Sequence, residues 1–535
     1  MGPDSDADAR STVPAPEPAG PGALAVTALF GLAAAGSALF LSNLALRRGV
    51  ALVAALGLIF LGLVSRRPRP ILLFCWTVTL TYNRNYFFEV FRAAGSYGPY
   101  WSPADAFLVA LLGYWLWEVV VRKRSRVPVG NRVWPWLLPF VVVAALSGIR
   151  AEHPEWSGYE LIRVLRIVLI VWYFRFNVRG PEWWACVAGL ATAVILQTGL
   201  GVIYALTGNR LGLAFVLGAD EDETLKIMRR LLEGVTDSDF GWRAEGTFGH
   251  PNTMAMYLLL VTPLFLSLAT APISRRHRGI CAAVGIVALA GIGVTQSRTA
   301  WALALAQAGA LAFGLAGRGL IRANRALGVA CFSGFLAILV LLPLSGRIER
   351  RIRENLRDEV DFRAKHDRIA LEIWQSVPFL GVGPNNYSDR LATRGEPEVD
   401  TFLSFEEAMR TRLELRITAW VHNIYLLMLA ETGAIGLAAL FFFFLGAVVM
   451  AVRGIRVRSP VWAAASLGLL IGMLGVHGHG TQEAAFWIDP VTYSFALVIG
   501  MLNNVPAIAR QEIDGASIES ARRVPHHGVA ASGAC

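Results

Sequence analysis

The chain has 535 residues, of which 55% are hydrophobic and only 16% charged, and its mean hydropathy is +0.50. This composition excludes an ordinary soluble protein and predicts an all-α, polytopic transmembrane helical bundle. The net charge of +10 does not indicate nucleic-acid binding, because no basic run outside the predicted loops is interleaved with aromatic residues. The five cysteines have neither metal-binding nor disulfide spacing.

In chain order, apolar stretches alternate with polar connections. We expect about 12–14 membrane spans at roughly 20 residues each. The candidate stretches include 22–45, 49–64 and 325–344. We expect the first apolar stretch to be retained in the protein and not cleaved as a signal peptide. The predicted segments are a disordered tail at 1–21, an N-terminal transmembrane bundle at 22–207, an extracytoplasmic loop at 208–251, transmembrane helices at 252–344, a large extracytoplasmic cap loop at 345–421, C-terminal transmembrane helices at 422–506 and a disordered cytoplasmic tail at 507–535.

The short basic connections predict the orientation of the bundle. Stretches such as "RKRSR" (122–126), "SRRHR" (274–278) and "RGIRVR" (453–458) are separated from one another by two predicted spans or a multiple of two. They therefore fall on one side of the membrane, which the positive-inside rule assigns to the cytoplasm. The segment 345–421 then lies outside, and its mixed charges and amphipathic stretches predict a small helical cap.

Polar residues that are not simple loop charges gather at the predicted outer border. Arg298 in "TQSRTAW" lies between two apolar stretches with almost no connection, so it is either an interfacial arginine whose side chain reaches the headgroups or a phosphate ligand. Arg243 and His250 precede a helix that begins near Pro251, and Asn252 follows in the same motif, "GTFGHPN". These residues are either ordinary helix-entry residues or anion ligands.

The stretch "VHNIYLLMLAETG" places His422 and Asn423 at the start of a predicted span. On a helix, Glu431 lies on the opposite face from His422 and roughly 13 Å deeper, so we do not expect it to orient the imidazole directly. By itself a histidine here is a helix cap, an interface residue or a catalytic base. "GVGPNNY", which contains Asn385, is either a plain loop or a turn whose N–H groups approach a ligand. His477, His479 and Glu483 lack convincing metal-ligand spacing, and we predict no metal site.

Taken together, these motifs resemble the O-antigen ligase and O-antigen polymerase family. The resemblance covers roughly residues 240–450 and rests on "GTFGHPN", "SRTAW", the cap stretch "RIALEIWQSVPFLGVGPNNY" and "VHNIYLLMLAETG", in that order. It implies a bacterial inner-membrane glycosyltransferase that moves a glycan, with inversion, from a polyprenyl diphosphate carrier to an acceptor at the outer face. It also implies that neither a cofactor nor a metal is required.

By motif position, the resemblance implies that His422 is the general base and that Arg298 binds the donor diphosphate, with Arg243 and Arg368 as further diphosphate ligands. His250, Asn252, Asn423 and Asn385 are accessory candidates. The expected partners are the lipid-linked glycan, a glycan, lipid or protein acceptor, and membrane lipid. The sequence leaves open a ligase, a repeat-unit polymerase or a protein transferase. Two other classes of protein also stay open. One is a lipid-linked oligosaccharide transporter, although the polar residues do not gather at mid-membrane as expected for a transporter. The other is a scaffold of a polysaccharide assembly complex.

Overall fold

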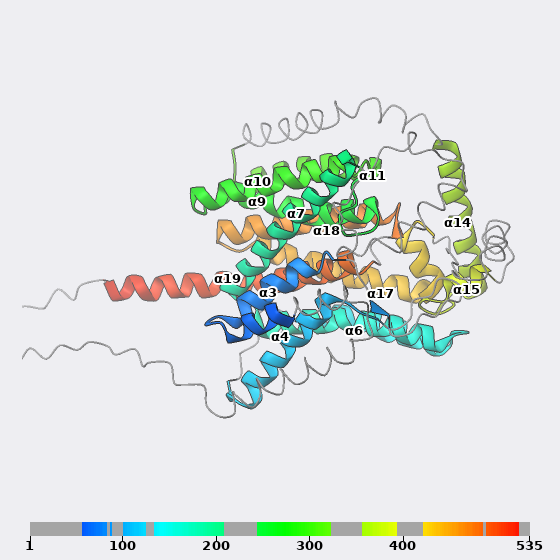
Figure 1. Cartoon of the computed structure of the whole chain (residues 1–535), viewed down its shortest axis with the longest axis horizontal. Coiled ribbons are helices and arrows are strands. Elements are labelled where there is room, and N and C mark those ends of the chain that lie inside the picture. Colours follow the sequence, from blue (N-terminus) through cyan, green and yellow to red (C-terminus); the bar gives the residue numbers. More distant parts are fainter. Residues whose placement is uncertain are drawn as a thin grey trace, which may run out of the picture. The chain divides into compact units, whose positions relative to one another are not determined.

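A computed structural model describes residues 56–82, 86–87, 100–124, 133–207, 243–322, 356–392, 421–484 and 488–523 (Figure 1). The chain separates into two units, Met1–Phe60 and Leu61–Cys535. Nearly all described residues belong to the second unit, and the fold below is that of this unit alone. The predicted stretch 22–45, residues 49–55 of the stretch 49–64 and the stretch 325–344 lie outside the described residues.

The described part of the second unit is built from helices, as expected for an all-α protein. The helices are α3 (Pro68–Thr79), α4 (Pro103–Val120), α5 (Trp134–Ile149), α6 (Pro154–Asn177), α7 (Gly180–Thr207), α9 (Pro251–Thr270), α10 (Arg275–Val294), α11 (Arg298–Gly317), α14 (Leu356–Ser376), α15 (Tyr387–Ala392), α17 (Ile424–Ile455), α18 (Pro460–Gly480) and α19 (Asp489–Arg523). The one exception within the described ranges is a two-residue antiparallel ladder between β1 (Tyr86–Phe87) and β2 (Tyr100–Trp101).

Eight described helices are long and apolar enough to cross a membrane, namely α4, α7, α9, α10, α11, α17, α18 and α19. The prediction of a polytopic helical protein is therefore confirmed. The start of the predicted disordered tail is wrong: α19 continues beyond residue 507 to Arg523. Its apolar face extends past the predicted span, because Ile508 and Ala509 are buried.

The centre of the bundle is formed by α9 and α18, which approach each other closely. A Cβ atom on Gly472 of α18 would lie 1.9 Å from the carbonyl oxygen of Leu260 in α9. Gln307 of α11 joins both helices, because its Nε2 donates to the carbonyls of Leu259 (3.0 Å) and Ile471 (2.9 Å). Small residues that permit close backbone contact, together with a bridging amide, are typical of helix packing within membranes.

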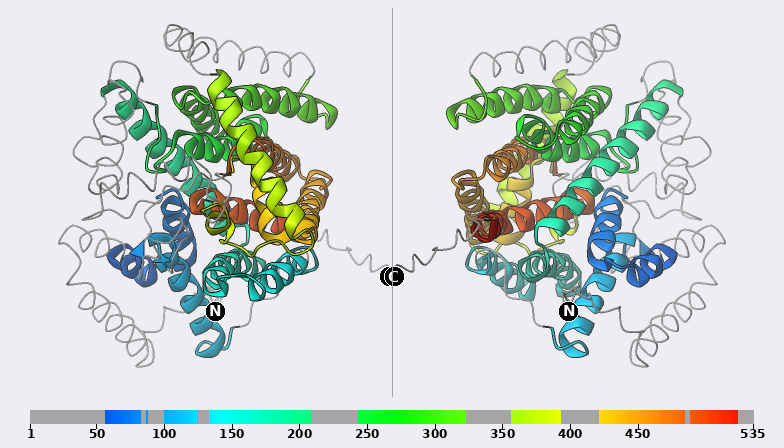
Figure 2. Two further views of the ribbon diagram at one scale, coloured as in Figure 1. Left: turned by 90° about the vertical axis from the view of Figure 1, so that its right-hand side faces the viewer. Right: turned by 90° about the vertical axis from the view of Figure 1, so that its left-hand side faces the viewer.

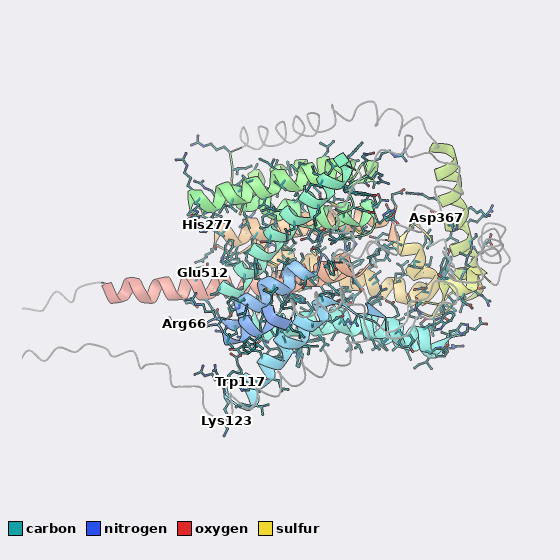
Figure 3. All side chains as sticks on the ribbon, in the orientation of Figure 1. Arg66, Trp117, Lys123, His277, Asp367 and Glu512 are labelled. Carbon is teal, nitrogen blue, oxygen red and sulfur yellow. The ribbon has the colours of Figure 1, made fainter. Side chains whose placement is uncertain are left out.

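The two ends of this bundle differ in character (Figure 3). Lys123, His277 and Glu512 lie at one end, and Asp367 of α14 lies at the other. The basic connections thus share one end, as the sequence predicted. Helix α14 crosses the helix ends opposite them and contacts α17 (Figure 2). The described part of the predicted cap segment 345–421 contains two helices, α14 and α15, joined by the irregular stretch 377–386.

Helix α17 is interrupted at Gly433, where the backbone turns to φ 69° and ψ −175°. The segment 378–383, which follows α14, fills the interruption. Four backbone hydrogen bonds replace the missing helical ones: from the N–H groups of Val382 to Ala430, Gly383 to Glu431, Ala434 to Pro378 and Ile435 to Phe379, at 2.8–3.3 Å. The cap is therefore joined to a spanning helix through main-chain atoms.

We expect Gly433→Ala to destabilise the protein by at least about 3 kcal/mol. This backbone conformation is essentially restricted to glycine, and an added Cβ would lie 2.2 Å from the main chain of Phe379. The matched control is Gly309→Ala in α11, where a Cβ meets nothing within 4 Å and helix propensity favours alanine. Thermal unfolding in detergent should show a lower midpoint only for Gly433→Ala, and equal midpoints would contradict this interpretation.

Candidate active site

His422 lies two residues before α17, at the end of the bundle that carries α14, and it contacts the segment that follows α18. Its Nδ1 is 3.0 Å from Oε1 of Glu483. The imidazole is about one-third exposed, whereas Glu483 is only 8% exposed. A carboxylate can only accept a hydrogen bond, so this contact places a hydrogen on Nδ1, and the neutral form of the imidazole then has its lone pair on Nε2.

The second oxygen of Glu483 connects His422 to the start of α9. Asn252 donates from Nδ2 to Oε2 of Glu483 at 2.7 Å and accepts at Oδ1 from Nη2 of Arg243 at 3.0 Å. Arg243 also donates from Nε to the carbonyl of Thr295, at 2.9 Å. One continuous chain of hydrogen bonds therefore runs from the imidazole to an arginine, which couples the orientations of the two groups.

Glu483 is held in its ionised form by this environment. Burial alone would raise the pKa of its carboxyl group, but the hydrogen bond from His422, the charge of His250 and the hydrogen bond from Asn252 hold the pKa well below its ordinary value of 4.5. Because the folded-state pKa is depressed, this group stabilises the protein fully above its ordinary pKa. That contribution is lost as the pH falls toward the folded-state pKa.

We expect Glu483→Gln to lower the free energy of unfolding by about 2 kcal/mol at neutral pH, since it replaces a charge-assisted hydrogen bond with a neutral one. The difference from wild type should shrink as the pH falls below about 4.5, where the wild-type carboxylate also loses its advantage. Thermal unfolding midpoints measured between neutral pH and acid pH test this. A difference that stays constant across this range would contradict the assigned electrostatics.

Helix α14 of the cap places further charges beside His422. Nη1 of Arg363 donates to the carbonyl of Gln482 at 3.1 Å, one residue before Glu483. Burial raises the pKa of Asp367, and electrostatic interactions with His422, His366 and Arg363 partly offset this effect. The cap therefore lies over the imidazole and supplies charges of both signs.

Arg298 begins α11 on the same turn that anchors Arg243. It is half-buried and is the first residue of the helix. Ser297, directly before it, is 3.3 Å through Oγ from Nε2 of His479, near the end of α18. The helix N-terminus adds a partial positive charge at this position. An arginine and a helix N-terminus together form a suitable environment for a phosphate group.

The remaining predicted site residues have structural contacts of their own. The side chain of Asn423 caps α17 by accepting from the N–H groups of Tyr425 and Leu426. His250 caps α9 through Nδ1, although its charge also acts on Glu483. Asn385 donates to the carbonyl of Trp156. Arg368 is 72% exposed at its side chain and pairs with Glu372 on the surface of α14. These contacts attach Asn385 to α6 and Arg368 to its own helix, and neither contact involves His422.

Glu431 is not a partner of His422, as the helical geometry predicted. Its Oε1 instead accepts from the N–H group of Tyr387 at 3.4 Å, in the cap segment that joins α17. The neighbouring loop is held by Asn386, whose side chain bonds to Ser157 and to the backbone of His153 and Pro384. The "GVGPNNY" loop therefore attaches the cap to α6 and α17.

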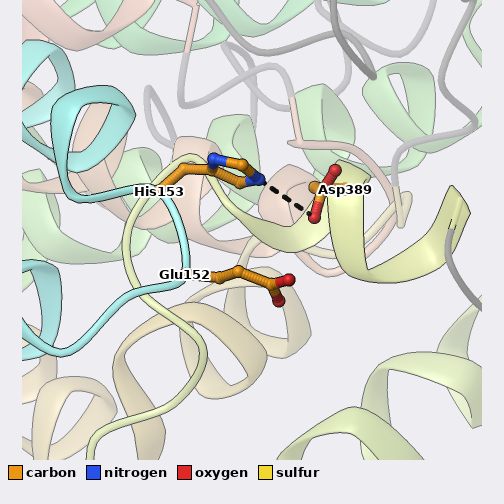
Figure 4. A group of neighbouring side chains, drawn as sticks. All are labelled: Glu152, His153 and Asp389. Atoms are coloured by element: carbon orange, nitrogen blue, oxygen red, sulfur yellow. Dashed lines mark ion pairs between the residues drawn. The ribbon is translucent and has the colours of Figure 1, made fainter.

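A separate group of possible ligands lies between the start of α6 and α15. Ligand atoms of Glu152, His153 and Asp389 all lie within 4.8 Å of one another (Figure 4). These side chains have partners already: His153 pairs with Asp389 at 3.5 Å and stacks on Trp156, and Glu152 pairs with Arg390. We therefore interpret this group as another attachment of the cap to the bundle.

The sequence of the chain matches a known protein family over part of its length. Residues 283–441 match the family model described as O-antigen ligase. This segment is an O-antigen ligase domain. The match supports an O-antigen ligase or polymerase type of membrane enzyme. No curated protein matches the chain.

The O-antigen ligase domain contains His422, Arg298 and the described part of the cap, whereas the residues that hold His422 come from outside it. Arg243 and Asn252 precede the matched segment, and Glu483 follows it. The position of Glu483 after an apolar span places it near the predicted outer border but does not pair it with His422, and no sequence pattern marks Arg363. The available signal for Glu483 was a lone carboxylate directly after an apolar span, where a charge requires a partner.

Proposed function

We propose that the enzyme transfers a glycan from a polyprenyl diphosphate to an acceptor hydroxyl with inversion, and that His422 is the general base. The supporting observation is the contact between Nδ1 of His422 and the buried Glu483, which leaves Nε2 as the basic nitrogen. In the proposed step the acceptor oxygen bonds to the anomeric carbon, the bond from that carbon to the diphosphate oxygen breaks, and the acceptor proton moves to Nε2. The diphosphate departs with the electron pair of the broken bond.

Positive charges near the imidazole would stabilise the departing diphosphate. Arg298 and Arg243 are the proposed ligands, because both are attached to the turn at 295–298 and Arg243 is linked to His422 through hydrogen bonds. Fixed cations that face a developing negative charge lower the barrier without reorganisation. Arg363 of α14 is a third candidate on geometric grounds, whereas Arg368 is supported only by the family resemblance.

We further propose that the site faces the exterior of a bacterial cytoplasmic membrane and that the reaction contributes to surface polysaccharide assembly. The basic connections lie at the end opposite α14, which the positive-inside rule places in the cytoplasm. The described part of the cap would then lie on the outer side, where acceptors arrive. The gathering of polar groups at one end favours an enzyme over a transporter, which is expected to place ionisable groups near mid-membrane.

The test is a transfer assay with purified protein, a polyprenyl-diphosphate-linked oligosaccharide and candidate glycan, lipid and protein acceptors. We expect release of the lipid diphosphate and formation of a new glycosidic bond with inverted configuration. A ladder of lengthening products would identify a polymerase, and a single attached glycan would identify a ligase. If the protein instead moves the lipid-linked sugar across a vesicle bilayer without any transfer, the proposal is wrong and the chain is a transporter.

A further inference from the structure

A basic cavity lies at the end of the bundle opposite the candidate active site. It is an open hollow with a volume of about 910 Å³, formed by the end of α17, by the connection that follows α17 and by the middle part of α19. Its charged lining residues are four arginines and one aspartate: Arg453, Arg456, Arg458, Arg510 and Asp514. A cavity of this size falls within the usual range for small-molecule sites, roughly 300–1,000 Å³.

The walls of this cavity are tightly packed. A Cβ atom on Gly454 of α17 would lie 2.2 Å from the hydroxyl oxygen of Ser466 and 3.5 Å from Val505 of α19. Nε1 of Trp462 in α18 donates to Oε2 of Glu512 at 2.6 Å, which ties α19 to α18 beside the cavity. Arg453 and the lining residues of α19 are therefore held on packed helices, whereas Arg456, Val457 and Arg458 belong to the connection between α17 and α18.

Among the described residues, the arginines of the cavity have no acidic partner. Within the described ranges, the guanidinium groups of Arg453, Arg456, Arg458 and Arg510 make no hydrogen bond or ion pair, and Asp514 is the only acidic residue in the lining. Basic residues are ordinary in cytoplasmic connections, so their presence alone identifies no site. Several arginines around one hollow favour the binding of an anion there, and the planar guanidinium group suits phosphate oxygens.

The position of the cavity indicates a lipid headgroup rather than a free anion. Arg510 lies 21 residues after Asp489, the first residue of α19, which at 1.5 Å per residue is about 32 Å and matches the hydrocarbon thickness of roughly 30 Å. Trp183 and Trp184 pack on Trp462 at the same end, with ring centroids 4.8 and 6.0 Å from it, and tryptophan gathers at the headgroup level. Ile513, 45% exposed, adds an apolar edge for the lipid chain.

We propose that this cavity binds the phosphate headgroup of an anionic phospholipid of the adjacent leaflet. Basic pockets between transmembrane helices are suited to such headgroups. The proposal concerns a second site, at the opposite end from His422, and does not depend on the transfer reaction.

The test uses the full chain in a neutral detergent, titrated with phosphatidylglycerol, phosphatidylcholine or inorganic phosphate, with bound lipid read by native mass spectrometry. Wild type should prefer phosphatidylglycerol by at least about tenfold, and the triple variant Arg456→Gln/Arg458→Gln/Arg510→Gln should lose that preference. The matched control, Arg275→Gln/Arg276→Gln/Arg278→Gln at the exposed start of α10, removes the same charge without touching the cavity and should retain it.

Three results would overturn the proposal: no preference in wild type, equal losses in both triple variants, or inorganic phosphate competing as effectively as the lipid. Equal losses would mean diffuse attraction, and effective competition by phosphate would mean a site for a free anion. Size-exclusion profiles and thermal midpoints check that both variants fold. Arg510→Gln alone, expected to weaken lipid binding by about fivefold, is measured if the triple variant does not fold.

Discussion

His422→Ala is expected to reduce glycan transfer by at least about 100-fold while leaving donor binding nearly unchanged. The imidazole is proposed to act on the acceptor hydroxyl, so its loss removes the base without removing a cation that holds the diphosphate. The partly exposed position of His422, with Nδ1 on buried Glu483, suits proton transfer to Nε2. Two measurements on purified protein test this prediction. The rate of glycan transfer should fall, and the affinity for the donor, measured separately, should stay nearly unchanged.

The control for this variant is His277→Ala, which removes an exposed histidine at the opposite end of the bundle (Figure 3). It should transfer glycan at the wild-type rate within about twofold, as expected for a surface substitution. Full activity of His422→Ala would reject the base assignment and return His422 to a purely structural role before α17. A parallel loss of donor binding would instead assign His422 to the donor.

Arg298→Ala is expected to lower kcat/KM for the lipid-linked donor by about 100-fold and to weaken donor binding as well. The guanidinium group at the N-terminus of α11 is proposed to contact the diphosphate both before and during bond cleavage, so both quantities change together. Arg298→Lys should recover only part of the loss, because an ammonium group cannot reproduce a planar, two-pronged contact. Transfer kinetics and a donor-binding titration measure these effects.

Arg318→Ala is the matched control, since Arg318 is exposed at the other end of the same helix. We expect its activity to remain within about twofold of wild type. If Arg298→Ala bound and transferred donor normally, the arginine would be an interfacial residue and the diphosphate ligand would have to be sought elsewhere, first at Arg243. Complete rescue by Arg298→Lys would show that a point charge suffices.

The sequence predicted the parts of the fold that depend on local composition. Apolar length and the basic connections gave the helical class and the end at which the basic loops lie, because the cost of burying polar groups in lipid constrains every span separately. The helix starts at His250 and Asn423 were also readable, since capping needs only neighbouring residues. The order of the motifs was sufficient to identify the O-antigen ligase domain.

The contacts that complete the candidate site could not be predicted in the same way. Glu483 is 61 residues from His422 and 231 from Asn252, and no periodicity relates positions so far apart. Helical numbering excluded Glu431 as the partner of His422 but could not supply the correct one. The exposed position of Arg368 likewise depends on which face of α14 meets the bundle, and this is set by tertiary packing.

The interruption of α17 at Gly433 also bears on the height at which the proposed reaction occurs. The part of the helix after it, 434–455, is about 33 Å long at 1.5 Å per residue and alone matches a hydrocarbon core of roughly 30 Å. In the proposed orientation the shorter part before it, 424–432, would stand above the lipid chains, with His422 at its outer end. The donor sugar and its acceptor could meet there in the aqueous headgroup layer, within reach of a lipid diphosphate. Neither the sugar nor the acceptor would have to enter the hydrocarbon core of the bilayer.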